Sequence, residues 1–136
     1  MTVTAQWDNE AKTIIRLEFV GKWTWAEHHE ANTVMEAMVN TASVTIDLIP
    51  DLSSSQLVPE GALSQARSIA MRQQIKFGLI VAVKAGKFIE ILYGVFQQLY
   101  GRRSGFPDTF FVDSLDEARA LIHTKRTRPM DEPRNP

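Results

Sequence analysis

Apolar and polar residues alternate along two stretches near the start of the chain, residues 3–8 and 13–20. A period of two is typical of strands that bury one face and leave the other in water. The polar segment between the stretches predicts a turn, so this part of the chain is expected to form an antiparallel hairpin. The positions expected to be buried are Val3, Ala5, Trp7, Ile15, Leu17 and Phe19.

Four later stretches of the chain have apolar residues at the spacing of amphipathic helices. Thr24 with Glu27, and Ser114 with Glu117, have the spacing of a capping box, in which side chains satisfy free N–H groups at a helix start. Both pairs therefore mark the beginning of a helix. Helices are predicted over residues 24–40, 60–74, 87–103 and 114–126.

Three further apolar runs, residues 43–49, 77–85 and 108–114, read as strands between the helices. Pro50 is expected to end the first of them and to open a loop of about ten residues. Alternating strands and helices predict an α/β fold. We expect a mixed, mostly parallel sheet of about five strands, with an N-terminal edge hairpin and about four helices.

Length and composition indicate one domain, over residues 1–123, with residues 124–136 as a mobile tail rich in proline. The chain has 136 residues and no cysteine, which excludes disulfides and a thiol nucleophile. No apolar run is long enough to span a bilayer, and no signal peptide is visible, so a cytoplasmic location is expected.

The net charge of −1 argues against a general nucleic-acid binder. Acidic residues predominate in residues 1–60 and basic residues in residues 61–136, which gives weak support for a protein partner. His28 and His29 are adjacent, so on a helix they point about 100 degrees apart and cannot share one metal ion. We predict no metal, no cofactor and no catalytic residues.

The order and lengths of these elements resemble the STAS-like domains, within the SpoIIAA-like group related to anti-sigma-factor antagonists. The resemblance extends from about Val3 to Ile122 and rests on four stretches: "FVGKWT", "AEHHEANTVMEAM", "VTIDL" and "FFVDSLDEARALI". It implies a STAS-like α/β fold. It also implies a serine site after the strand "VTIDL", because the antagonists are phosphorylated on a serine there.

Ser53, Ser54 and Ser55 lie near the place where that phosphorylated serine would stand. The surrounding signature is absent: no acid immediately precedes these serines and no glycine follows them. Two readings stay open, a phosphorylation loop and a solvated loop whose hydroxyls bond to the backbone, and the residues favour the second. Asp47 could act as a base, but an acid at this place in a strand more often forms a structural pair.

The helix predicted after residue 86 carries two apolar stripes, an unusually wide apolar arc. The stripe of Phe88, Leu92, Phe96 and Leu99 is expected to face the sheet. A two-fold contact is expected to use Ile89, Tyr93 and Tyr100. The candidate interface residues, or walls of an apolar-ligand pocket, are Ile89, Tyr93, Phe96 and Tyr100.

These observations favour a non-enzymatic STAS-like regulatory or protein-interaction domain that self-associates as a homodimer. The alternative is a small-molecule or lipid-binding domain with an apolar pocket beside residues 87–101. A small hydrolase that uses Asp47 and a loop serine is the least favoured reading. An enzyme would need a histidine or second acid within hydrogen-bond reach of a serine.

Overall fold

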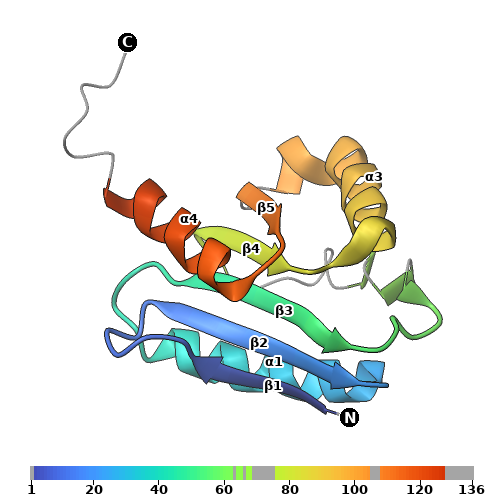
Figure 1. The fold of residues 1–136 in the computed structure, drawn as a ribbon, viewed down its shortest axis with the longest axis horizontal. Coiled ribbons are helices and arrows are strands. Elements are labelled where there is room, and N and C mark those ends of the chain that lie inside the picture. The colour runs from blue at the N-terminus through green and yellow to red at the C-terminus, as the bar shows by residue number, and fades with distance from the viewer. Residues whose placement is uncertain (1, 63, 66, 69–75, 105–107, 128–136) are drawn as a thin grey trace.

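The chain forms a five-stranded mixed sheet with helices on both faces (Figure 1). This computed structural model describes residues 2–62, 64–65, 67–68, 76–104 and 108–127, and in the helix over residues 86–104 it leaves out the side chains of residues 96, 97 and 99–104. The strands are β1 (Thr2–Trp7), β2 (Ile14–Gly21), β3 (Asp47–Ser55), β4 (Leu79–Val83) and β5 (Asp108–Val112). The helices are α1 (Trp25–Asn40), α3 (Gly86–Ser104) and α4 (Leu115–Thr127).

The strands lie in the order β1-β2-β3-β4-β5. β1 pairs with β2 in the antiparallel sense, and β2 through β5 are parallel to one another. The predicted α/β class, the five strands and the N-terminal edge hairpin are therefore confirmed. The hairpin turn is closed by the Asn9 side chain, whose Oδ1 accepts hydrogen bonds from the backbone N–H groups of Thr13 and Ile14.

Alternating strand residues build two separate cores. Ile15, Leu17 and Phe19 of β2 pack with α1, which lies behind β1 and β2 in Figure 1. Ile49 of β3 and the apolar side of β4 pack with α4 on the other face. The buried residues of this second core are Ile49, Leu79, Val81 and Val83 of the strands and Ala118 and Ile122 of α4.

Three of the four predicted helices are among the described elements. α1 begins with the predicted capping box: Thr24 Oγ1 accepts from the Glu27 N–H, and Glu27 Oε1 accepts from the Thr24 N–H. The helix predicted over residues 60–74 lies largely outside the described residues, and those described between 62 and 68 are helical. No helix in the described part of the chain is both long and apolar enough to cross a membrane.

The end of α4 lies past residue 123, where the predicted tail begins. The helix continues to Thr127, whose hydroxyl donates to the His123 carbonyl at 2.9 Å. The first four residues of the predicted tail are thus helical, because Arg126 is anchored to the sheet. The remainder of the predicted tail, residues 128–136, lies outside the described residues.

Candidate functional site

The three serines belong to a strand rather than to a loop, which corrects the prediction that Pro50 ends β3. β3 runs on to Ser55, and Ser54 and Ser55 lie opposite Val20 and Gly21 of β2. Proline removes one donor, but its fixed backbone angle is compatible with an extended chain. β4 ends at Val83, opposite Asp51, so the last residues of β3 pair with β2 alone.

Asp51 is the acid that the sequence analysis missed beside these serines. Its Oδ1 accepts hydrogen bonds from the hydroxyl of Ser53 at 2.6 Å and from the Ser53 N–H at 3.1 Å. The β2–β3 register shifts between Glu18 and Val20, so one extra β3 residue lies in this region. Asp51 is 5% exposed, and Arg16 Nη1 lies 3.7 Å from its Oδ2. Ser53 therefore holds a charge-assisted bond within its own strand.

Asp47 cannot act together with these serines. It begins β3, whereas Ser53 lies six residues later, about 20 Å away along an extended strand. The Asp47 carboxylate accepts from the Leu79 N–H at 2.9 Å and from Arg126 Nε at 2.9 Å, with a further bond from Arg126 Nη2. These bonds raise the pKa of Arg126 above its ordinary value. Asp47 is thus a structural partner of α4, which agrees with the structural role that the sequence favoured over a catalytic one.

The opposite end of β3 carries a cluster of aromatic rings. Trp23 Nε1 donates to Ser55 Oγ at 2.9 Å, and the Ser55 hydroxyl donates to the Leu57 carbonyl at 3.2 Å. The ring of His28 lies 5.7 Å from that of Trp25, and its Nδ1 is buried with no hydrogen-bond partner among the described residues. Burial lowers the pKa of His28 to about 4, with a smaller effect from His29. His28 is therefore neutral at pH 7 and serves as an aromatic packing residue.

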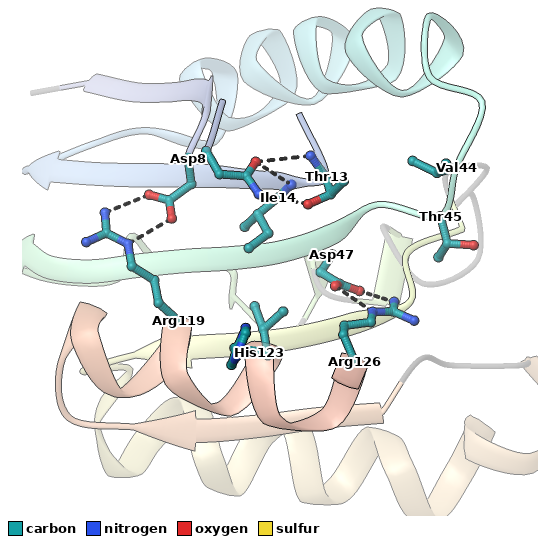
Figure 2. A pocket seen from close by; sticks show the side chains of 11 residues that line it. Asp8, Thr13, Ile14, Val44, Thr45, Asp47, Arg119, His123 and Arg126 are labelled. Atoms are coloured by element: carbon teal, nitrogen blue, oxygen red, sulfur yellow. Dashed lines mark hydrogen bonds and ion pairs between the residues drawn. The ribbon is translucent and has the colours of Figure 1, made fainter. Parts of the chain in front are cut away.

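A groove of about 660 Å³ lies between α4 and the amino-terminal ends of β2 and β3 (Figure 2). At one end Arg119 donates through Nε and Nη2 to Asp8, both at 2.8 Å, and at the other end Arg126 pairs with Asp47. His123 lies between the two arginines on the same helix. Each arginine already has a carboxylate partner, so the charges of the two arginines and the two aspartates balance.

Both ion pairs fasten α4 to the sheet. The carboxylates of Asp8 and Asp47 are almost fully buried, and each arginine side chain is 45% exposed. The positive charge of each arginine therefore compensates a negative charge buried beneath α4. The hydrogen bonds that Arg119 donates to Asp8 raise the pKa of Arg119 above its ordinary value. His123 has no acid bonded to its ring among the described contacts. The groove has the size of a ligand site, and its charged groups already perform a structural role.

The orientation of α3 differs from the predicted one at Phe88, which is exposed, and at Tyr93, which packs against the sheet, whereas Leu92 is half-buried. Phe88, Ile91 and Val95 are 56%, 60% and 43% exposed. Tyr93 instead packs edge-on against Phe111 of β5, with ring centroids 5.6 Å apart. Ile89, Leu92 and Tyr93 are all half-buried. The sequence offers two stripes of similar apolar character, and contact with Phe111 selects the stripe that contains Tyr93.

We call the exposed trio of Phe88, Ile91 and Val95 the α3 patch. Of the predicted interface residues, Tyr93 contacts Phe111 of the sheet and Ile89 is half-buried. The side chains of Phe96 and Tyr100 lie outside the described ones, so their predicted role stays a prediction. In the described chain, no group of three His, Asp or Glu side chains could hold a metal ion.

A scan against protein-family models, a search of curated proteins and a search of solved structures found no match to this chain. The resemblance to STAS-like domains therefore stays a resemblance of pattern.

Proposed function

We propose that this chain is a non-enzymatic, STAS-like regulatory domain that works by protein–protein contact, with the α3 patch as its contact surface. The observation that carries the proposal is the outward exposure of Phe88, Ile91 and Val95 on one helix. Large apolar side chains scattered singly over a surface are ordinary, whereas a contiguous group marks an interaction site. Among the residues whose side chains are described, the other large exposed apolar ones, Val34, Val44 and Leu57, come from three separate segments.

The partners of the buried aspartates agree with a binding role. Asp47 and Asp8 are occupied by arginines that fix α4, and Asp51 is bonded to Ser53 and flanked by Arg16. Each of these buried acids thus has a structural explanation. A cytoplasmic location accords with this function and stays a prediction.

A photo-crosslinking amino acid placed at Ile91, in cells that produce the protein, tests the contact surface. We expect a discrete adduct heavier than the 15.4 kDa chain. The matched control is the same amino acid at Val34, which is 49% exposed and lies on α1 rather than on α3. Equal labelling at both positions, or no adduct at Ile91, would contradict the proposal.

A second candidate function is the binding of a small molecule, which the groove beneath α4 favours. Its volume of about 660 Å³ falls within the range of ligand sites, and Ile14 and Ile122 give it an apolar lining. This groove lies at α4 and not beside residues 87–101, where the sequence suggested a pocket. Native mass spectrometry of the purified protein tests this candidate: a retained small molecule supports it, and a bare chain mass counts against it.

A further inference from the structure

The groove beneath α4 buries its carboxylates and exposes the arginines that pair with them. The side chains of Asp8 and Asp47 are each 3% exposed, whereas those of Arg119 and Arg126 are each 45% exposed. A ligand that enters the groove therefore meets arginine N–H groups before it reaches either aspartate. We propose that the groove binds a small organic anion, a carboxylate carried on an apolar body. This inference rests on the second candidate function and names the chemical class of its ligand.

Arg126 supplies the main binding group for the carboxylate. A guanidinium has five N–H donors, and Asp47 accepts from two of those on Arg126, one on Nε and one on Nη2. Three donors thus remain, and no described residue accepts from them. The two bonds to Asp47 also hold the guanidinium in one orientation, so the remaining donors point in a fixed direction. The ion pair therefore leaves Arg126 oriented and able to bind an anion.

Two further polar groups lie near Arg126. Thr45 lines the same end of the groove, and His123 lies one helical turn before Arg126 on α4 (Figure 2). Among the described residues, neither the Thr45 hydroxyl nor the His123 ring has a hydrogen-bond partner. Both groups can donate to a carboxylate, whose two oxygens accept up to about four hydrogen bonds. Donors from α4 and from the segment before β3 thus converge on one end of the groove.

The Arg119 end of the groove is less suited to an anion. Arg119 donates through Nε and Nη2 to Asp8, and its Nη1 lies 3.8 Å from Asp116 Oδ1. The Asp116 side chain is 96% exposed, so it adds an accessible negative charge at this end. A single anionic group is therefore expected to bind, and to bind at the Arg126 end.

The apolar part of the lining fits the body of such a ligand. Ile14 of β2 and Ile122 of α4 line the groove, as does Val44, which is 57% exposed. An apolar group placed against these side chains would remove apolar surface from water, which a bare anion cannot do. The volume of about 660 Å³ is within the range of sites for small organic molecules. The groove thus provides for both parts of the proposed ligand.

Cinnamate, which joins an aromatic body to one carboxylate, is a suitable probe. We expect it to shift the NMR signals of the Ile14 and Ile122 methyl groups in the purified chain. A dissociation constant on the order of 1 mM is expected for a molecule of this size. Cinnamamide, the neutral amide of the same shape, and acetate, which lacks the apolar body, should each bind at least tenfold more weakly.

Two substitutions at one exposed position test the charge of the ligand without changing Arg126. Val44→Glu and Val44→Lys both remove the valine and differ in the sign of the charge beside the groove. Cinnamate should bind Val44→Lys about tenfold more tightly than Val44→Glu, because a charge about 6 Å from the carboxylate attracts it in one variant and repels it in the other. The matched controls are Val34→Glu and Val34→Lys, at an exposed residue of α1 that does not line the groove, and these should bind cinnamate alike.

The pattern of affinities decides the proposal. Equal affinity for cinnamate and cinnamamide, or for the two Val44 variants, would show that the groove does not select an anion. Small-molecule binding would then stand, and the inference about the ligand class alone would fail. If no probe shifts Ile14 or Ile122, the inference is overturned, and a native mass spectrum with a bare chain mass would show that the second candidate function fails with it.

Discussion

Gly78 leaves the space in which Arg126 reaches Asp47, so Gly78→Ala is expected to break that ion pair. A Cβ at position 78 would clash with Arg126 Nη2, and it would lie 2.7 Å from Asp47 Oδ1 and 2.8 Å from Thr45 Cγ2. The arginine head is the most mobile of these groups, so it is expected to swing out into solvent. The backbone of Gly78 has no positive φ, so alanine itself adds no backbone strain.

The magnitude follows from the burial of the two partners. Asp47 is 2% exposed, and among its bonds to described residues the one from the Leu79 N–H would remain without Arg126. Breaking a fully buried pair costs about 3–5 kcal/mol, because an uncompensated charge is left behind. The Arg126 side chain is 45% exposed, so water already screens part of the interaction. We expect Gly78→Ala to lower the free energy of unfolding by about 2 kcal/mol.

A double-mutant cycle isolates the ion pair from the other contacts at this position. Urea unfolding of Gly78→Ala, Arg126→Ala and the double variant gives the three free energies that the cycle needs. If the glycine acts by admitting Arg126, alanine at position 78 should cost at least about 1 kcal/mol less in the Arg126→Ala background. Simple additivity of the two changes would refute this reasoning and assign the cost to the clash with Thr45 and Asp47.

Two further predictions concern the aromatic cluster and α3. His28 has a folded-state pKa of about 4 against 6.5 when unfolded, so the unfolded chain binds the proton first and stability falls as the pH drops below about 6.5. Between pH 7 and pH 5 the free energy of unfolding, measured in urea, should fall by about 2 kcal/mol from this cause. His28→Gln should remove this fall. An unchanged pH dependence in that variant would exclude His28 as the source. Tyr93→Asp should lower the melting temperature by several degrees, because a carboxylate would replace the ring against Phe111. Circular dichroism checks this change, and a native melting curve would contradict the assigned orientation of α3.

Elements with strong local signals were predictable from the sequence. The capping box of Thr24 and Glu27 fixed the start of α1, and its two hydrogen bonds are present. At α4, Ser114 Oγ accepts from the Glu117 N–H as expected, while Glu117 itself bonds the Asp113 N–H. Capping involves residues within one turn, so a short stretch of sequence contains the whole interaction.

The candidate site depended on interactions that no short stretch contains. Asp47 meets Arg126 across 79 residues, and Asp8 meets Arg119 across 111 residues. The prediction that β3 ends at Pro50 was wrong because β3 pairs with both β2 and β4, and this pairing outweighs the backbone N–H donor that proline lacks. The two stripes of α3 were equally apolar in sequence, and only the position of Phe111 on the folded sheet distinguishes them.

Sedimentation velocity over a range of concentrations tests most directly whether the homodimer expected from the sequence forms through the α3 patch. The native protein should shift with rising concentration toward twice the 15.4 kDa chain mass. Ile91→Asp should remain monomeric with a native circular dichroism spectrum, since its charge is solvated in the monomer and desolvated in the dimer. Val34→Asp, at a side chain of similar exposure on α1, should associate as the native protein does. A native chain that stays monomeric at every concentration, or an Ile91→Asp variant that associates equally well, would contradict the account.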